Sequence, residues 1–337
     1  MRLLQITLQR DSYLLLDDIL SEIEPERLLP AIETENCVLL QVVVRSSGAE
    51  PLMDKIEKRL NRVDNFTMML LPLYATLPRL PDEEKKDQLD KKSETVKAPK
   101  IFNRVSREEL YASINSGINN LQYYITMVII ACVVAAIGLI RDDIAIIIAA
   151  MVIAPLLGPN MALALATTLA DKELAKDASK MGAIGVFLAL IISYCIGYFT
   201  RIDPTVPAIA ARTSLGLSDL VLALSSGVAG ALALTAGASA TLIGVMVAVA
   251  LMPPLVATGM LWGAGFYQLA FNALLLTAAN VICVNLAGVA TFMWQGVRPL
   301  SWWDKSKAKK ASRNAAVIWA TLVVVLIAVV KLRFVPT

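Results

Sequence analysis

The chain has 337 residues, of which 57% are hydrophobic, with a mean hydropathy of +0.63 and a formal net charge of +3. Soluble globular proteins are closer to about 45–50% apolar, so this composition excludes an ordinary soluble domain, and the small net charge gives no indication of nucleic-acid binding. The sequence has no histidine, the commonest metal ligand, and its four cysteines lie far apart, without metal-type spacing. We therefore expect no metal site, no cofactor and no nucleic-acid partner.

Charged residues are concentrated near the N-terminus, since 37 of the 59 lie within residues 1–120. This asymmetry divides the chain into a polar N-terminal third and an apolar remainder. The first thirty residues contain no apolar run of signal-peptide length and no small-residue cleavage site. We therefore expect the N-terminus to stay in the cytoplasm.

Residues 1–75 predict a small α+β domain. Apolar residues alternate in 2–9, which indicates a strand, and recur at helical spacing in 12–24, which indicates a helix, while 37–45 is rich in β-forming residues. In chain order the predicted elements are a strand at 2–9, a helix at 12–24, strands at 27–34 and 37–45, a helix at 49–62 and a strand at 65–74. The order βαββαβ is that of the ferredoxin-like fold, which we predict for this cytoplasmic domain.

The next two segments connect this domain to the apolar part of the chain. Residues 76–105 are rich in proline, lysine and acidic residues, so they cannot bury a core and predict a charged linker. Residues 106–120 begin with Ser106 and Glu109, the spacing of a capping box. They predict a short amphipathic helix at the membrane surface.

The remainder of the chain predicts a membrane all-α bundle of about seven spans. A helix rises 1.5 Å per residue, so crossing a hydrocarbon core of about 30 Å takes about 20 apolar residues. The segments of this length are 121–140, 144–170, 181–199, 219–236, 238–265, 268–294 and 314–331, the last within a final helix and short tail at 314–337. With the N-terminus inside, the lysine-bearing loop 171–180 and the basic loop 295–313 are cytoplasmic and 200–218 is an outer loop, as the positive-inside rule requires.

Two of the long spans carry prolines near their middles. The span 144–170 contains APLLGPN, from Ala154 to Asn160, and the span 238–265 contains MPPLVATG, from Met252 to Gly259. Proline lacks an N–H group and clashes with the preceding helical turn. We therefore predict that each span consists of two half-helices joined by exposed backbone.

The two breaks also resemble each other, which predicts an internal repeat. At an offset of 99 residues, Pro155, Leu156 and Met161 correspond to Pro254, Leu255 and Met260, and, four residues off that register, ELAKDA at 173–178 parallels QLAFNA at 268–273. Two copies of a three-span unit, 121–199 and 219–294, follow from this match. Because three spans are an odd number, the second copy is inverted relative to the first.

A broken helix in lipid must turn its free backbone groups toward protein or a polar cavity. Two breaks related by inversion would meet near the bilayer midplane and form a site for a small ion or polar solute. The candidate site residues are Ala154, Pro155, Gly158, Pro159, Asn160, Pro253, Pro254, Thr258, Gly259, Asn280 and Asn285. The competing interpretation is that both places are kinks sealed by neighbouring helices, with Asn280 and Asn285 acting as helix–helix contacts.

Charged side chains are missing from the interior of the predicted spans. Arg141, Asp142, Asp143, Asp171 and Asp219 all lie at span ends, which argues against a carboxylate proton relay. The spans also offer no combination of nucleophile and base. We therefore expect a protein that is not an enzyme.

Several motifs resemble a known prokaryotic family. They are SREELYASI, MVIAPLLGPNMALALATTLAD, SGVAGALALT, LIGVMVAVALMPPLVATGM and LLLTAANVICVNLAGVATF, in this order over roughly residues 105–296. They are similar to the family known as "domain of unknown function 389". The resemblance implies a multi-pass protein of a bacterial or archaeal inner membrane, and it supplies no substrate.

Two functions remain open from the sequence. The first is a transporter or channel for a small ion or polar solute, with its site at the two broken helices. The alternative is a non-transporting membrane sensor or scaffold, whose N-terminal domain binds a ligand or mediates oligomerisation. The small-residue-rich span 219–236 permits close helix packing, so a homo-oligomer in the lipid bilayer is expected in either case.

Overall fold

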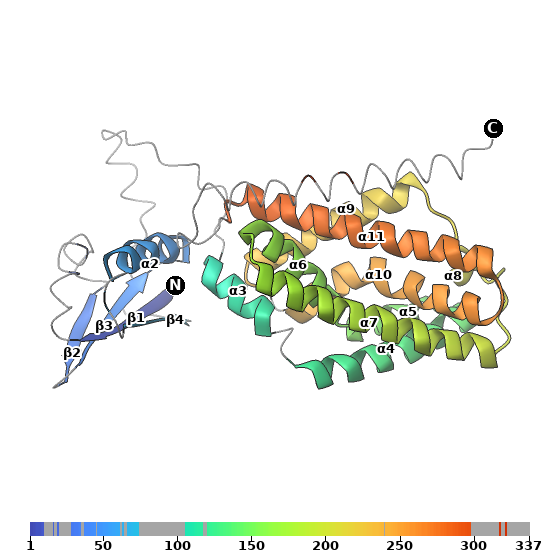
Figure 1. Ribbon diagram of the computed structural model, residues 1–337, viewed down its shortest axis with the longest axis horizontal. Helices are drawn as coiled ribbons and strands as arrows, with labels where there is room; N and C mark the ends of the chain where they lie inside the picture. The colour runs from blue at the N-terminus through green and yellow to red at the C-terminus, as the bar shows by residue number, and fades with distance from the viewer. Residues whose placement is uncertain are drawn as a thin grey trace. The chain divides into compact units, whose positions relative to one another are not determined.

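The computed structural model divides into two compact units, Met1–Glu109 and Leu110–Thr337 (Figure 1). The residues it describes are 1–9, 16, 19, 28–34, 37–44, 46–60, 63, 66–73, 105–116, 120–238, 240–297, 317 and 321. Most of the predicted helix at 12–24, nearly all of the linker at 76–105 and most of the last span at 314–331 therefore lie outside the described residues.

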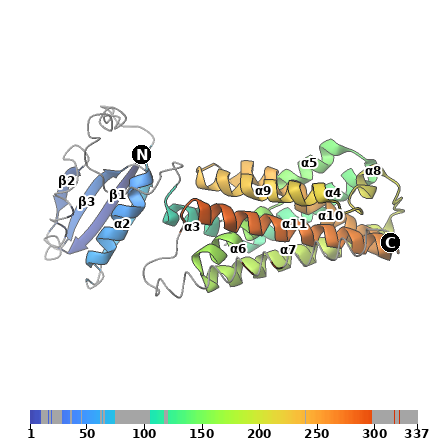
Figure 2. The ribbon, with the colours of Figure 1, turned by 90° about the horizontal axis from the view of Figure 1, so that it is seen from above.

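The N-terminal unit contains a four-stranded antiparallel sheet. Its strands are β1 (Arg2–Gln9), β2 (Leu28–Glu33), β3 (Cys37–Val44) and β4 (Thr67–Pro72), and they lie in the order β2-β3-β1-β4. Alternate residues of β1 and β3, such as Leu4, Ile6 and Leu40, are fully buried on one face, as a period of two requires. Helix α2 (Ser46–Leu60) lies across this face (Figure 2), where its Ile56 and Leu60 complete the core.

The predicted strands are confirmed to within two residues at each end, with two local differences. Helix α2 begins at Ser46, three residues before the predicted start, so Pro51 lies inside the helix and leaves the carbonyl group of Ser47 without its helical N–H. Strand β2 carries Pro30 and changes register against β3 between Leu29 and Ile32. Proline is tolerated there because β2 is an edge strand.

The second unit is a bundle of long apolar helices (Figure 1). Its elements are α4 (Leu121–Arg141), α5 (Ile144–Ile153), α6 (Leu157–Leu169), α7 (Lys172–Phe199), α8 (Pro207–Ala210), α9 (Leu217–Thr235), α10 (Ala240–Gly263) and α11 (Tyr267–Trp294); α3 (Arg107–Ser116) precedes them and contains the boundary between the units. Among the described residues, four helices are long and apolar enough to cross a membrane, and five if the bent pair α5 and α6 counts as one span. Seven spans are not confirmed.

The outward faces of these helices are apolar. On α4, the exposed side chains Ile129, Val133, Ile137 and Ile140 recur at helical spacing and form one stripe. A soluble protein rarely exposes such a continuous apolar surface. Together with the length of the helices, this surface makes the unit membrane-embedded.

The first predicted break is confirmed. Helices α5 and α6 are bent by 52° relative to each other. Ala154 between them is extended, with φ −67° and ψ 117°, because the residue before a proline is disfavoured in the helical region. Pro159 removes no further helical hydrogen bond, since it lies in the first turn of α6, where a backbone N–H group has no helical acceptor.

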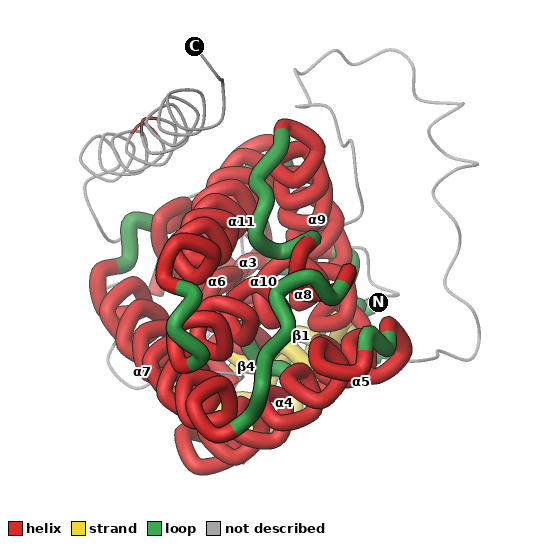
Figure 3. Tube along the Cα trace, turned by 90° about the vertical axis from the view of Figure 1, so that its right-hand side faces the viewer, coloured by secondary structure: helices red, strands yellow, loops and turns green. Residues whose placement is uncertain are grey.

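The second predicted break is wrong, because α10 is one continuous helix that contains Pro253 and Pro254. Helix α10 contacts α4, α5, α6, α7, α9 and α11, and Figure 3 shows it inside the ring of helices. Every residue from Leu251 to Leu261 is buried. Proline inside a membrane helix is tolerated when neighbouring helices enclose it, and this enclosure is what the sequence did not reveal.

Glycines allow α7 and α10 to pack at backbone distance. A Cβ atom added to Gly197 would overlap the carbonyl oxygen of Met260, and one added to Gly263 would overlap that of Tyr194. Gly259 likewise faces Ser193, with no room for a side chain. Small residues at such contacts are how membrane helices approach closely.

We predict that Gly197→Ala destabilises the protein by about 1–3 kcal/mol, because the new methyl group meets backbone atoms that cannot move aside. Gly182→Ala, on the same helix, is the matched control, since its Cβ would meet only Pro159 Cβ at an ordinary 3.5 Å. Thermal unfolding in detergent measures both. Equal melting temperatures would contradict the close contact between α7 and α10.

Candidate functional site

A cavity of about 250 Å³ lies among five helices of the membrane unit. It is lined by Tyr124 of α4, by Leu156, Pro159, Asn160 and Leu163 at the break and start of α6, by Ala178, Ser179, Gly182, Ala183 and Val186 of α7, by Leu251 and Leu255 of α10, and by Thr277 and Val281 of α11. At about 30 Å³ per water molecule in the liquid, this volume corresponds to about eight waters. The cavity therefore has room for a small solute.

The position of the cavity along the helices shows where it begins and ends. Tyr124 lies in the first turn of α4, and the exposed Ser179 lies in the charged first third of α7. Leu251 and Thr277 lie near the middles of α10 and α11, and Leu156 lies at the break. The cavity therefore extends from one end of the bundle toward its centre, where the broken helix borders it.

Two asparagines join the broken helix to α11. Asn285 Nδ2 donates hydrogen bonds to Asn160 Oδ1 at 2.8 Å and to the carbonyl oxygen of Val281 at 2.9 Å. Asn160 Nδ2 donates to the carbonyl oxygen of Leu156 at 2.8 Å. Each amide nitrogen carries two hydrogens, so Asn285 uses both of its N–H groups in these bonds and Asn160 uses one of its two. Because Asn160 lines the cavity, its second N–H is a donor available to a ligand.

Tyr124 also lines the cavity, and its side chain ends in a buried hydroxyl group beside Gly185. The side chain is 1% exposed, and its oxygen has no hydrogen-bond partner among the described residues. Gly185 makes room for it, since a Cβ atom there would overlap the hydroxyl oxygen. A buried polar group without a partner costs about 1–3 kcal/mol, so a ligand or water that accepted its hydrogen bond would recover this energy.

The predicted site residues fall into two groups. Around the first break, Pro159 and Asn160 line the cavity. Ala154 is the buried C-cap residue of α5, and Pro155 and Gly158 are half-buried beside it. The residues predicted around the second break do not line it. Pro253, Pro254 and Thr258 are buried inside α10, where Thr258 Oγ1 donates to the carbonyl oxygen of Pro254 at 2.7 Å, and Gly259 packs against α7.

The two asparagines of α11 also differ. Asn285 is fully buried and contacts the broken helix, whereas Asn280 is 5% exposed and is not among the lining residues. The sequence predicted Asn160 and Asn285 as separate candidates and grouped Asn285 with Asn280, whereas the structure joins Asn285 to Asn160. The sequence missed Tyr124, Ser179 and Thr277, because a hydroxyl in an apolar run gives no sign of the direction in which it points.

Acidic residues at the other end of the bundle cap helices. Asp142 Oδ1 accepts a hydrogen bond from the backbone N–H of Ala208 at 2.8 Å, and Asp143 Oδ1 caps α5. Arg212 donates to the carbonyl oxygen of Ala208 at 3.0 Å; burial lowers its pKa, and Asp142 partly offsets this. In the described part of the chain, no group of three or more histidine, cysteine or acidic residues could hold a metal ion.

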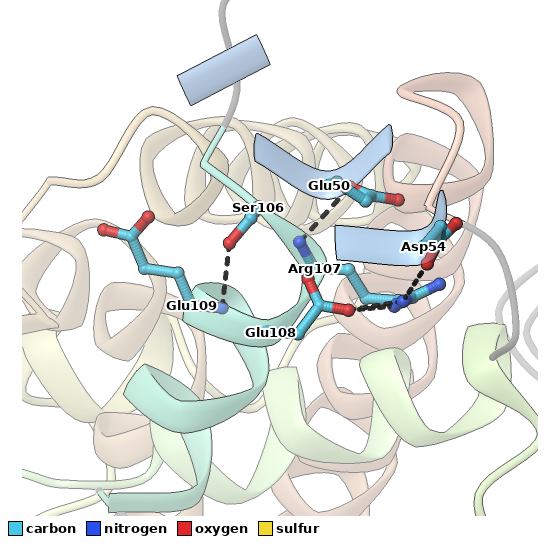
Figure 4. Close-up of polar contacts among 6 residues, drawn as sticks. All are labelled: Glu50, Asp54, Ser106, Arg107, Glu108 and Glu109. Atoms are coloured by element: carbon cyan, nitrogen blue, oxygen red, sulfur yellow. Dashed lines mark hydrogen bonds and ion pairs between the residues drawn. The ribbon is translucent and has the colours of Figure 1, made fainter. Parts of the chain in front are cut away.

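A second polar cluster lies in the N-terminal unit, at the first turn of α3 (Figure 4). The guanidinium group of Arg107 is almost fully buried, donates to Asp54 of α2 at 3.1 Å and pairs with Glu108. Burial opposes the charge of Arg107, but Glu108, Glu50 and Asp54 outweigh it and raise the pKa above its ordinary value.

The predicted capping box at the same turn is half formed. Ser106 Oγ accepts a hydrogen bond from the backbone N–H of Glu109 at 3.2 Å. The carboxylate of Glu109 pairs instead with Arg2 of β1, at 2.9 and 2.6 Å. The pair of Glu109 with Arg2 thus fastens the start of α3 to the sheet, and the pair of Arg107 with Asp54 fastens it to α2.

Comparison with known proteins places this architecture in a family. The model of the domain of unknown function DUF389 matches residues 151–286. Over 284 residues the chain is 35% identical to the uncharacterized protein MJ0678 of Methanocaldococcus jannaschii, and the match covers 84% of each chain. The chain belongs to the DUF389 family. No solved structure matches it. The DUF389 region contains the break, α10 and both members of the Asn160–Asn285 pair.

We predict that Asn160→Ala and Asn285→Ala are energetically coupled, because each removes the same hydrogen bond. The double variant should lose less stability than the two single variants together. The difference should be about 0.6 kcal/mol, with about 1.7 kcal/mol as the upper bound. Unfolding in mixed micelles measures the cycle. A control cycle pairs Asn160→Ala with Thr291→Val, whose hydroxyl bonds its own helix, and should be additive.

We predict that Arg107→Met accelerates amide hydrogen exchange over residues 107–116, because the first turn of α3 loses its contacts with α2. Lys58→Met is the control, since Lys58 is an exposed cation at the end of α2. Exchange measured by mass spectrometry on the full chain should rise in the first variant alone. Unchanged exchange in Arg107→Met would show that the cluster does not hold this helix.

Proposed function

We propose that this DUF389 protein moves a small polar solute or ion across the bilayer, through a pathway that includes the cavity beside the broken helix. The observation that carries the proposal is a solute-sized cavity inside an apolar bundle, whose lining includes Asn160 and Tyr124, the latter with a buried, unpartnered hydroxyl. Close-packed interiors leave few voids larger than a water molecule, so a space of about 250 Å³ is more than packing alone leaves.

The helix contacts support an inverted repeat in which α4, α5/α6 and α7 correspond to α9, α10 and α11. Helix α4 packs on α7 as α9 packs on α11, and α7 packs on α10 as α11 packs on α6. The residue offsets agree with this pairing. An offset of 99 relates Asn160 to Gly259, and the 95-residue offset of the ELAKDA and QLAFNA segments relates Leu190 to Asn285. Gly259 indeed faces the carbonyl oxygen of Leu190, as Asn160 faces Asn285.

Only one of the two corresponding helices is broken, and this supports an alternating-access mechanism. The cavity lies beside the broken α5/α6 and extends toward one end of the bundle. In the opposite state we propose that one repeat has rocked against the other, so that the cavity opens toward the other end of the bundle.

Orientation, assembly and the N-terminal fold belong to the same proposal. We place the N-terminal unit in the cytoplasm of a prokaryotic cell, the bundle in its inner membrane, and several copies in a homo-oligomer. The lysines of 171–180 and the basic loop 295–313 support this orientation. The antiparallel order β2-β3-β1-β4 supports a ferredoxin-like fold for the N-terminal unit.

The alternative, a non-transporting sensor or scaffold, is favoured by the Arg107 cluster. It fastens the start of α3 to the N-terminal unit, and the chain continues from α3 into α4. A ligand that bound the N-terminal unit would change how the start of α3 is held, and α3 leads along the chain into α4. Deleting residues 1–100 separates the two functions, because a transporter should retain some flux and a sensor should lose its response.

Purified protein in proteoliposomes tests transport directly. The wild type should pass at least one of glycerol, sodium, rubidium or chloride faster than protein-free liposomes. Asn160→Leu, which removes a polar group of the cavity, should slow that flux about tenfold. Ile148→Leu, on an exposed face of α5, is the control. If the wild type passes none of these solutes, the proposal fails.

A further inference from the structure

The charges around the cavity restrict what it can hold. Among the described residues that line it, none is aspartate, glutamate, lysine or arginine. All but four of the lining residues are apolar. The four polar ones come from four different helices and are Tyr124, Asn160, Ser179 and Thr277. Desolvating an ion in such surroundings costs several kcal/mol unless an opposite charge compensates it.

The hydrogen-bonding groups restrict the ligand further. Two of the lining residues have a donor that no described residue uses, Tyr124 with its buried hydroxyl and Asn160 with its second N–H. Thr277 Oγ1 already donates to the carbonyl oxygen of Ala273 at 2.9 Å, so toward the cavity it can only accept. A complementary ligand therefore offers at least one acceptor, and a hydroxyl group satisfies both kinds of partner.

The start of α6 does not change this conclusion. Its N-cap, Leu156, has no side-chain cap, and Pro159 at the third helical position has no N–H to offer. A helix N-terminus contributes about half a unit of positive charge. This favours an acceptor oxygen and does not balance the full charge of an anion.

We infer that the cavity binds a small uncharged solute with a hydroxyl or carbonyl oxygen, which accepts a hydrogen bond from Tyr124. The inference rests on the proposed function, because it names the substrate class of the same pathway and excludes ions from it. The room for about eight waters limits the solute to the size of a small polyol or amide.

Cysteine labelling tests the charge selectivity without requiring transport. In the full chain with its four cysteines replaced by alanine, Thr277→Cys places a thiol deep in the cavity and Ser179→Cys places one at the exposed end. The reagents are a neutral hydroxyethyl, an anionic sulfonatoethyl and a cationic trimethylammonium methanethiosulfonate. Each transfers its alkylthio group to the thiolate, which forms a disulfide and releases methanesulfinate.

At Ser179→Cys all three reagents should react. At Thr277→Cys the neutral reagent should be favoured over both ions by at least about tenfold relative to Ser179→Cys, because a charge at this depth is poorly solvated. Ser193→Cys is buried outside the cavity and should react with none. Two results would overturn the inference. One is that charged reagents label Thr277→Cys as fast as they label Ser179→Cys, and the other is that no reagent labels Thr277→Cys. Leu163→Cys, also in the lining, repeats the test if Thr277→Cys does not fold.

Protection by glycerol tests the role of Tyr124. Glycerol should slow neutral labelling of Thr277→Cys, and adding Tyr124→Phe should weaken this protection about threefold, the effect of one hydrogen bond. Adding Tyr123→Phe should not, because the neighbouring Tyr123 is 58% exposed and lies outside the lining. No protection at all, or protection that survives Tyr124→Phe, contradicts the inference.

The outcomes separate the inference from the proposed function. Neutral-selective labelling and glycerol protection without any flux in proteoliposomes would support the site and refute transport. Flux of sodium, rubidium or chloride that Tyr124→Phe slows would support transport and overturn the assignment of an uncharged solute.

Discussion

The bilayer core offers no water, so every backbone N–H and C=O group there must be hydrogen-bonded inside the protein. Helices α4, α7, α9 and α11 meet this requirement by being continuous. The chain departs from it at the turn from Ala154 to Leu156, and two side chains fix the start of α6 there. Asn160 donates to the carbonyl oxygen of Leu156, and Asn285 on α11 holds Asn160 in place. A side-chain pair thus joins the broken helix to α11 beside the cavity.

The same constraint has a different solution in α10. Pro253 and Pro254 deprive two carbonyl groups of their helical donors, yet the helix continues through them. Six other helices contact α10, and the residues around the prolines are all buried. A straight path through a tightly enclosed position leaves no room for a turn such as the one at Pro155. Enclosure by neighbours therefore decides whether a proline-containing segment bends.

Small residues serve two purposes along α7. Toward its C-terminal end, Gly197 lets the backbone of α7 meet that of α10 with no side chain between them. Toward its N-terminal end, Gly182 and Ala183 leave space that the neighbouring helices do not fill, and this space is part of the cavity. One helix is thus tightly packed at one end and borders a cavity at the other. This difference gives the membrane unit a cavity that begins at one end and stops near the middle.

Much of this architecture could be predicted from local patterns. The alternation in 2–9 and the β-rich composition of 37–45 predicted two strands, and the length of apolar runs such as 121–140 and 268–294 predicted spanning helices. The bend at Pro155 followed from the restriction that proline places on the residue before it. Asn160 and Asn285 were recognisable as polar groups in apolar surroundings, although their mutual hydrogen bond was not.

What the tertiary structure decided is which of two similar proline segments opens and which hydroxyl groups face a cavity. The segments around Pro155 and Pro254 share Pro, Leu and Met at an offset of 99 residues, but one is bent by 52°, while the other is buried from Leu251 to Leu261 among the described helices and stays helical. Tyr123 and Tyr124 are adjacent and chemically identical, yet one is exposed and the other is buried above Gly185. Periodicity and proline geometry act over a few residues and can be read along the chain. Enclosure depends on helices more than a hundred residues apart, so it exists only once they have packed.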